Sequence, residues 1–233
     1  MDVSRETAAA VFGVGLPAAE AYAGLLAGPG VERGLIGPRE VDRLWSRHLI
    51  NCAVVAPAFP ETGEVVDVGS GAGLPGIPLA IARPQLTVRL VEPLLRRARF
   101  LEEMAGILKL ANVEVLRCRA EDLAGTGVPV ATARAVAPLN RLARWCLPML
   151  RPGGVLLAFK GARADAELAA AAAGLPDLGA QSWAIEEHGR GLIEPPVRVV
   201  RITAGDRTGA RRIRSTRSGR ARPRLPGASN GTA

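Results

Sequence analysis

The sequence predicts an α/β fold, a doubly wound and mostly parallel sheet with an antiparallel pair of strands at one edge and a helical cap at the N-terminus. Three observations support this. From residue 64 onward, short valine-rich apolar runs alternate with helical stretches, as in parallel strands joined by crossover helices. A glycine-rich turn follows the first of these runs. Before residue 60, apolar residues instead recur at the three-to-four spacing of helices.

Length and charge divide the chain into three expected parts. The 233 residues, 48% of them hydrophobic, suffice for one α/β domain with additions. We expect a helical cap at 1–60, a ligand-binding sheet domain at 61–204 and a basic tail at 205–233. The tail has eight arginines and one acid, so it carries +7 of the chain's formal charge of +8. Because it has almost no apolar residues, we expect it to be disordered.

The cap is expected to consist of helices. Apolar periodicity predicts them at 8–11, 18–26 and 41–55, with breaks rich in glycine and proline at 13–17 and 28–38. The third helix carries Arg47 and His48. Two interpretations of these two residues stay open: the helix packs on the sheet, or it turns them toward a substrate.

The sheet domain alternates strands and helices. Strands are expected at 65–68, 87–91, 113–117, 130–133 and 154–159, and helices at 74–83, 94–110, 139–150 and 162–173. Two further strands, at 180–187 and 197–203, have only a loop rich in glycine and proline between them. They should therefore form an antiparallel pair at one edge.

The first strand runs into a turn with three alternating glycines, Gly69, Gly71 and Gly73, which begins directly after Asp67. Glycine lets the backbone turn sharply and lets a ligand approach without a Cβ in between. A strand, a glycine turn and the start of a helix together form a cradle for nucleotide-type ligands. The alternative is a plain structural corner.

Two cofactors compete for this cradle. G-x-G-x-x-G at 71–76 matches the dinucleotide pattern, and D-x-G-x-G-x-G at 67–73 matches the loop of S-adenosylmethionine (SAM) methyltransferases. In the dinucleotide pattern the pyrophosphate lies on the helix N-terminus, where the carboxylate of Asp67 would repel it. SAM has no phosphate and carries an ammonium and a sulfonium, which an acid attracts. The sequence favours SAM, and a dinucleotide-dependent oxidoreductase is the rival.

Further candidate residues follow the other strands. Ligands of doubly wound sheets bind at the carboxyl ends of the strands, where this sequence has Glu92, Ala120, Glu121, Arg134 and Lys160. Glu92 follows the first glycine of the turn by 23 residues, the expected place for a carboxylate that accepts both ribose hydroxyls. The pair at 120–121 either caps a helix or meets an adenine edge. Lys160 is one of only two lysines.

The metal-ligating residue types are sparse. Three widely spaced cysteines, Cys52, Cys118 and Cys146, form no C-x-x-C pair and are expected to be buried and reduced. The only histidines are His48 and His188. We therefore expect no metal site.

The composition also bears on membranes and nucleic acids. No apolar signal core follows the polar N-terminus, and no uninterrupted apolar run approaches the ~18 residues of a membrane span. We expect a cytoplasmic protein without membrane contact. Aromatic residues make up 3% of the chain, too few to form a platform for stacking a run of bases.

At residues 67–79 the sequence D-V-G-S-G-A-G-L-P-G-I-P-L resembles the signature of the bacterial small-subunit rRNA guanine-N7 methyltransferases, the RsmG family, formerly GidB. The resemblance covers roughly 35–203. Ala133 stands where the family usually has Ser, and G-L-I-G at 34–37 replaces an Asn-Leu-Thr-type segment. Further similar segments are R-R-A-R-F-L at 96–101, R-A-V-A-P-L at 134–139, K-G at 160–161 and R-H-L at 47–49.

The resemblance implies a SAM-binding methyltransferase domain at 61–204 and a Rossmann-like class I fold. The enzyme would methylate N7 of one guanine in the decoding-region loop of 16S rRNA, in the small ribosomal subunit or an assembly intermediate of it. We expect it to act as a monomer. Carried over by motif, the SAM contacts fall at Gly69, Leu74, Ala120, Glu121 and Arg134.

The chemistry fits the residues present. Guanine N7 already exposes a lone pair, so its methylation requires no general base, only placement against the methyl carbon. Arg134 and Lys160 are candidates for holding the guanine, or else they form ordinary ion pairs with acids nearby. Arg47 and His48 are candidates for RNA contacts. A non-enzymatic alternative is an rRNA-binding assembly factor that kept the fold and lost catalysis.

Overall fold

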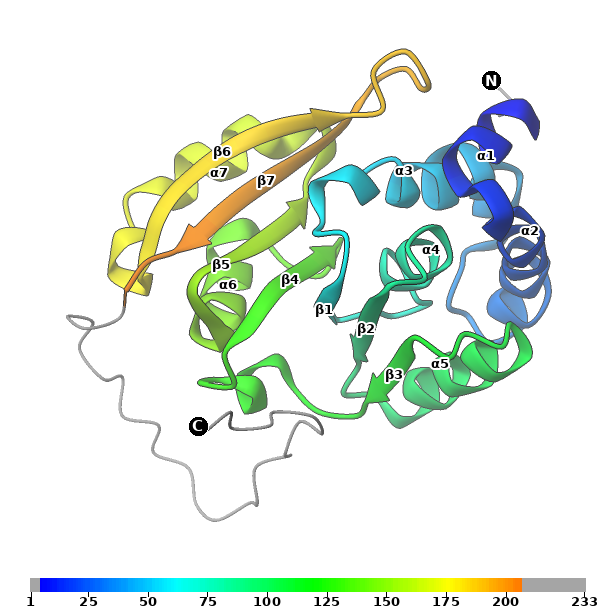
Figure 1. Ribbon diagram of the computed structural model, residues 1–233, viewed down its shortest axis with the longest axis horizontal. Helices are drawn as coiled ribbons and strands as arrows, with labels where there is room; N and C mark the ends of the chain where they lie inside the picture. The colour runs from blue at the N-terminus through cyan, green and yellow to red at the C-terminus, as the bar shows by residue number, and fades with distance from the viewer. Residues whose placement is uncertain (1–4, 207–233) are drawn as a thin grey trace.

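A computed structural model describes residues 5–206 as a single seven-stranded sheet with helices on both faces (Figure 1). The expected tail, apart from Gly205 and Asp206, lies outside the described residues. The strand order is β3-β2-β1-β4-β5-β7-β6, and β7 runs antiparallel to both β5 and β6. This confirms the predicted parallel sheet with an antiparallel edge pair. The strands are β1 (Gly63–Val68), β2 (Leu86–Val91), β3 (Val113–Leu116), β4 (Val128–Arg134), β5 (Leu150–Phe159), β6 (Ala180–His188) and β7 (Val197–Ala204).

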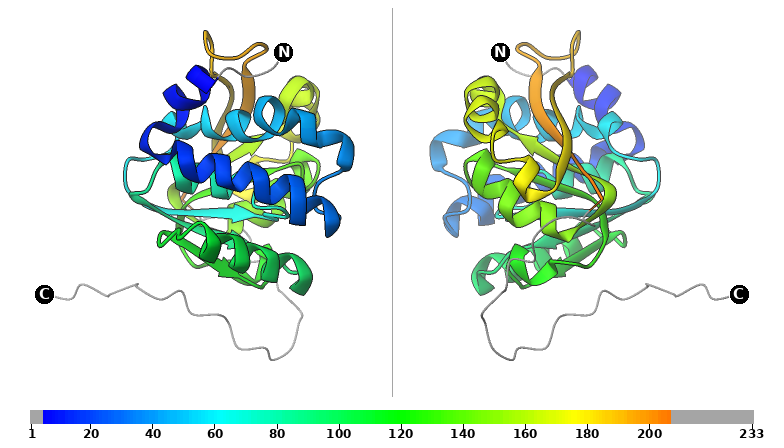
Figure 2. Two further views of the ribbon diagram at one scale, coloured as in Figure 1. Left: turned by 90° about the vertical axis from the view of Figure 1, so that its right-hand side faces the viewer. Right: turned by 90° about the vertical axis from the view of Figure 1, so that its left-hand side faces the viewer.

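The two faces of the sheet carry different helices. Helices α1 to α5 supply the core on one face, and α6 and α7 supply it on the other. The two views of Figure 2 show these layers in turn, with the N-terminal helices in blue and α6 and α7 in yellow-green. The helices are α1 (Arg5–Phe12), α2 (Leu16–Leu25), α3 (Ile50–Ala53), α4 (Gly76–Ala82), α5 (Leu95–Ile107), α6 (Leu139–Cys146) and α7 (Ala164–Ala172).

Strand alternation explains why the central strand β1 has consecutive valines. In β1, Val65 joins the core under the N-terminal helices, whereas Val66 and Val68 join the core under α6 and α7. Successive side chains of a strand point to opposite faces, and both faces here are covered. A valine run without polar alternation is therefore the expected sequence.

The cap shares the core of the sheet. Phe12, Tyr22, Leu26 and Leu49 are at most 4% exposed and belong to the same apolar cluster as Val65. By length and composition alone, the helical stretch Arg5–Gly30 could cross a membrane. In this structure, its largest apolar side chains pack inside the domain.

The helices of the cap differ from the predicted ones. The second does not break at 28 but continues as a π-helix, Leu26–Gly30, which accommodates Pro29. The predicted helix at 41–55 is composed of a 3₁₀-helix at Pro38–Arg43, a π-helix at Leu44–Leu49 and the short α3. Apolar spacing does not distinguish these helix types over so few residues.

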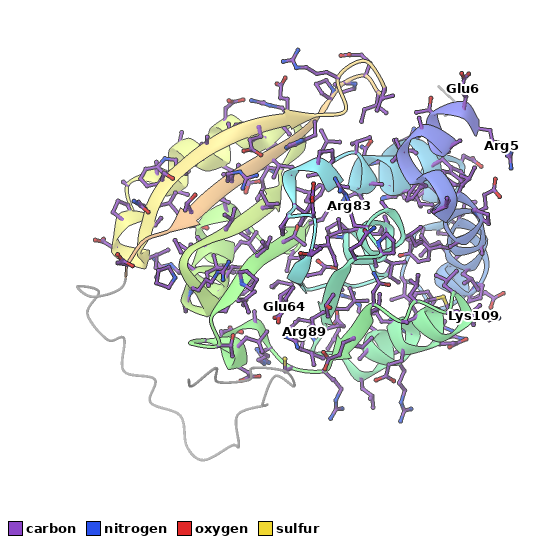
Figure 3. The ribbon with its side chains drawn as sticks, in the orientation of Figure 1. Arg5, Glu6, Glu64, Arg83, Arg89 and Lys109 are labelled. Atoms are coloured by element: carbon purple, nitrogen blue, oxygen red, sulfur yellow. The ribbon has the colours of Figure 1, made fainter. Side chains whose placement is uncertain are left out.

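A charged cluster lies within the sheet, away from the glycine turn. Arg89 of β2 forms ion pairs with Glu64 of β1 and with Glu114 of β3, where its Nε lies 2.8 Å from Oε2. Figure 3 labels Arg89 beside Glu64. The arginine is 5% exposed, so its charge is balanced inside the sheet by the two carboxylates. We assign this cluster a structural role.

Candidate cofactor and substrate site

The loops at the carboxyl ends of β1, β2, β3 and β4 surround a cavity of about 680 Å³, which we call the glycine-loop cavity. Its size lies in the range of small-molecule sites. Most of the residues predicted from the sequence as site residues line it. These are Arg47, His48, Gly69, Gly71, Leu74, Glu92, Ala120, Glu121 and Arg134. Three others, Asp67, Gly73 and Lys160, do not.

The three glycines of the turn all have positive φ, at +70° for Gly69, +58° for Gly71 and +103° for Gly73. A Cβ on Gly69 would lie 2.8 Å from the side chain of Val136, and one on Gly73 would lie 2.8 Å from Tyr22 Oη. Gly71 has no such neighbour, so only its backbone conformation requires glycine there. The turn therefore needs glycine at all three positions.

Glu92 fixes the turn from the second strand. One carboxylate oxygen accepts the Gly71 N–H at 3.1 Å, and the other accepts the Leu94 N–H at 3.0 Å. The residue is 2% exposed, and Arg97 Nη1 lies 3.9 Å from its Oε2. The sequence predicted a carboxylate at this cavity, and the structure adds that it also holds the loop.

Asp67 has a different place from the predicted one. It is fully buried behind the turn, where its Oδ2 accepts the Gly76 N–H at 3.1 Å at the start of α4. Its carboxylate therefore does not line the glycine-loop cavity, whereas the sequence analysis expected it to face a cationic ligand. Burial raises the pKa of Asp67 to about 7, although hydrogen bonds from Ser70 and Gly76 oppose the rise.

The stability of the protein should consequently depend on pH through Asp67. The folded protein keeps this proton between about pH 4 and pH 7, where an unfolded chain has lost it. The stabilising contribution is complete below about pH 4 and is lost as the pH rises toward 7. We expect Asp67→Asn to flatten this part of the profile of unfolding free energy, measured by urea denaturation across pH. The exposed Asp177→Asn is the control, and equal slopes in parent and Asp67→Asn would contradict the assignment.

Arg134 connects β4 to the cap. Its guanidinium donates to the carbonyl oxygens of Arg47 (2.7 Å) and His48 (3.1 Å) and to Cys52 Sγ (2.8 Å). A further contact of 3.2 Å joins its Nη2 to His48 Nδ1. The arginine therefore lies between the cavity and the cap, with much of its donor capacity already used.

The two basic residues of the cap that line the cavity, Arg47 and His48, are paired with Glu40. Arg47 Nη1 lies 3.2 Å from Glu40 Oε1, and His48 Nε2 lies 2.9 Å from Glu40 Oε2. Since His48 Nδ1 faces a guanidinium donor, its proton is on Nε2 and is donated to Glu40. Burial is the largest influence on His48 and lowers its pKa, in spite of the Glu40 carboxylate. The structure places both basic residues at the cavity wall.

The side chain of Lys160 links the loop after β4 to helix α7. Its Nζ donates to the Ala137 carbonyl at 2.7 Å and lies 2.9 Å from Glu167 Oε2, and its side chain is 6% exposed. The carboxylate of Glu167 in turn accepts the Leu139 N–H at the start of α6. Of the two interpretations of Lys160, ion pairing with a nearby acid is the one that the structure shows.

A second cavity, of about 1160 Å³, adjoins the first and is bounded on one side by the connection between β6 and β7. We call it the hairpin cavity. The two cavities share Arg134, Ala135 and Val136 at the end of β4. Ala135 has a φ of +55°, rare for a residue other than glycine, and Val136 is 36% exposed between the cavities. Strained backbone of this kind is typical of functional loops.

Two site residues were missed by the sequence analysis. Tyr22 of α2 is fully buried, and its hydroxyl donates to the Ala72 carbonyl at 2.7 Å, so the cap helps to hold the glycine turn. It is the only tyrosine of the chain, and this could have marked it as a residue with a specific hydrogen-bond partner. Val136 lies in the R-A-V-A-P-L segment at 134–139 that resembles the family, but an apolar loop residue has no pattern of its own that marks it as a site residue.

The cysteines are all free. Cys52 and Cys146 are buried as expected, but Cys118 is only half-buried. Burial raises the pKa of all three thiols, that of Cys118 to about 11, which keeps them protonated. Within residues 5–206, no three His, Cys, Asp or Glu side chains are grouped so that they could hold a metal ion.

Comparisons with known proteins identify the family of the chain. The family described as "rRNA small subunit methyltransferase G" (GidB) matches residues 16–191. A Streptomyces coelicolor protein named Ribosomal RNA small subunit methyltransferase G is 53% identical over 226 residues, covering 94% of this chain and 95% of that protein. A protein of the same name from Salinispora tropica is 56% identical over 200 residues, covering 82% of this chain and 83% of its own.

Solved structures support the fold. The apo form of the SAM-dependent methyltransferase SibL has a TM-score of 0.57 at 19% identity, covering 79% of this chain and 62% of that chain. The YcgJ protein of Bacillus subtilis has a TM-score of 0.53 at 11% identity, covering 68% of this chain and all of that chain. These matches agree with the predicted Rossmann-like fold of class I SAM-dependent methyltransferases. Given the family match and the high identity to full-length relatives, the chain belongs to the rRNA small subunit methyltransferase G family.

Proposed function

We propose that this protein transfers the methyl group of SAM to N7 of one guanine in 16S rRNA of the small ribosomal subunit or its assembly intermediate. The observation that carries the proposal is the pair of adjoining cavities that share the wall Arg134–Ala135–Val136. Methyl transfer requires a donor and an acceptor to meet in line, and two adjoining cavities that share lining residues place a donor site next to an acceptor site. The protein would act in the cytoplasm as a monomer.

The glycine-loop cavity fits SAM. Gly69 and Gly71 line the cavity, so a ligand can approach the backbone of the turn with no Cβ in between. The cavity wall contains two carboxylates, Glu92 and Glu121, which suit a ligand that carries positive charge and ribose hydroxyls. When bound there, SAM supplies an electrophilic methyl group. Glu92 would hold the ribose, and Ala120 and Glu121 the adenine.

The hairpin cavity suits a guanine whose reacting atom does not have to lose a proton. The lone pair of guanine N7 is already free to attack the methyl group, so the protein has only to orient the base and exclude water. His48 is the one histidine in either cavity wall, and Arg134 occupies its Nδ1 while Glu40 occupies its Nε2. The site thus has no free imidazole base among the described residues, and the proposed reaction needs none.

Two alternatives make different predictions. An assembly factor without catalysis would bind rRNA and transfer nothing. A dinucleotide-dependent oxidoreductase would be stabilised by NAD(P), but the carboxylate of Glu92 in the cavity wall disfavours a pyrophosphate at that place.

Labelled methyl transfer tests the proposal directly. Purified protein, SAM with a labelled methyl group and small-subunit rRNA from a strain lacking the protein should give one labelled guanine, located by mass mapping. Reverse transcription after chemical cleavage at N7-methylguanine should stop at the same position. Absence of label from RNA and from assembled subunits, with normal SAM binding, would favour the assembly factor.

Glu92→Gln should weaken SAM binding. The amide can keep one acceptor oxygen but loses the charge that holds the N–H groups of Gly71 and Leu94 and, as proposed, the ribose. Loss of a hydrogen bond to a charged group costs about 1.5–3 kcal/mol, so we expect a Kd at least about 10-fold higher by calorimetry. Glu102→Gln, on the exposed side of α5, is the control. An unchanged Kd in folded Glu92→Gln would remove Glu92 from the site.

A further inference from the structure

The connection between β6 and β7 forms one wall of the hairpin cavity. It projects at the top of Figure 1, beyond the ends of β4 and β5 and toward the cap. A turn anchors it, because the N–H groups of Leu192 and Ile193 both donate to the Gly189 carbonyl at 3.0 Å. Ile193 packs on the apolar core that the cap shares with the sheet. Glu194 follows this anchored residue directly, so its position in the wall is defined.

Most charged side chains of the cavity wall are already paired. Arg134 is bonded to the cap, Lys160 is paired with Glu167, and Arg198 lies 2.6 Å from Asp165 Oδ2. Of the wall acids, only Glu194 makes no hydrogen bond or ion pair with any residue between 5 and 206. It is also exposed.

An unpaired carboxylate is unfavourable next to RNA unless it contacts a base. Phosphates repel it, and the affinity of proteins for RNA depends mainly on cations. A carboxylate only accepts hydrogen bonds, so it selects a base edge that presents donors. Among the four bases, only the Watson–Crick edge of guanine presents two adjacent donors, N1–H and the 2-amino group. The same edges of adenine, cytosine and uracil all place an acceptor beside their donor.

We propose that Glu194 is the residue that selects guanine, with its two carboxylate oxygens accepting the N1–H and the 2-amino group of the target base. The inference rests on the proposed function, and it assigns the base specificity to one side chain. The base would lie against the apolar side chains of the wall, including Val136, Pro195 and Pro196. Contact on the Watson–Crick edge leaves N7 free to face the wall that both cavities share.

The test compares guanine with inosine, which lacks only the 2-amino group. Small subunits are assembled with either base at the position that the wild-type protein methylates, and kcat/KM is measured with wild type, Glu194→Gln and Glu61→Gln. Glu61 is exposed at the amino end of β1, outside both cavities, and makes the matched control.

We expect wild type and Glu61→Gln to prefer guanine over inosine by about 10-fold or more, the value of one hydrogen bond to a charged group. Glu194→Gln should lose about 10- to 100-fold on guanine, keep its SAM affinity, and show a guanine-to-inosine ratio close to one. A folded Glu194→Gln that keeps the wild-type ratio would overturn the inference while the proposed function stands. A wild-type protein that methylates neither RNA would overturn both.

Discussion

Gly76→Ala is expected to destabilise the protein by about 1–3 kcal/mol or more and to abolish SAM binding. Gly76 is the first residue of α4, and its φ is not in the left-handed region, so the effect is purely one of space. A Cβ there would collide with the side chain of Leu90 and lie 2.7 Å from Asp67 Oδ2. Both neighbours are buried in central strands and cannot move aside.

Urea denaturation measures the loss of stability, and the shift in Tm on adding SAM measures binding. Gly106→Ala is the matched control, because Gly106 lies in helix α5 with no atom within 4 Å of an added Cβ. The control should be stabilised by about 0.5–1 kcal/mol, since alanine favours the helix. If Gly76→Ala behaves like the control, α4 does not pack on β1 and β2 as described.

Arg134→Met is expected to release the cap from the sheet domain and to lower methyl transfer by about 100-fold or more. Methionine keeps the apolar part of the side chain but donates nothing to the carbonyls of Arg47 and His48 or to His48 Nδ1. Leaving such partly buried acceptors unpaired costs about 1–3 kcal/mol each. The loop at the end of β4, which lines both cavities, would lose its fixed position at the same time.

Hydrogen exchange should show the release directly, with faster exchange at 44–52 and little change in β4 and β5. Arg144→Met, on the exposed side of α6, removes the same charge without these bonds and should exchange like the parent. Methyl transfer at the parental rate in Arg134→Met would mean that the link to the cap has no part in the reaction.

The residues that sequence analysis placed correctly are those whose position follows from one strand end. Gly69 and Glu92 come directly after β1 and β2, Ala120 lies in the connection that follows β3, and parallel strands bring these ends together. Lys160 also follows a strand, yet its partners Ala137 and Glu167 are 23 and 7 residues away along the chain. No local pattern indicates whether such a cation faces a ligand or the protein.

Asp67 illustrates a second limit. Its position at the end of β1 was clear, but whether its carboxylate points into the cavity or behind the turn depends on α4. The start of α4 at Gly76, two residues later than predicted, provides the N–H that turns the carboxylate inward. The 3₁₀ and π segments of the cap were beyond prediction because hydrogen-bond pattern, not composition, distinguishes them.

The π-helix Leu44–Leu49 constrains how this chain can change in length. A residue added to or removed from a helix rotates everything before it by about 100° around the axis, from 3.6 residues per turn. Glu40 lies before the π-helix and pairs with Arg47 and His48 within it. A single deletion here would convert the segment toward an ordinary α-helix and swing Glu40 away from both partners. A substitution in this segment changes one side chain and leaves the helix register intact, whereas an insertion or deletion changes the register of every residue before it.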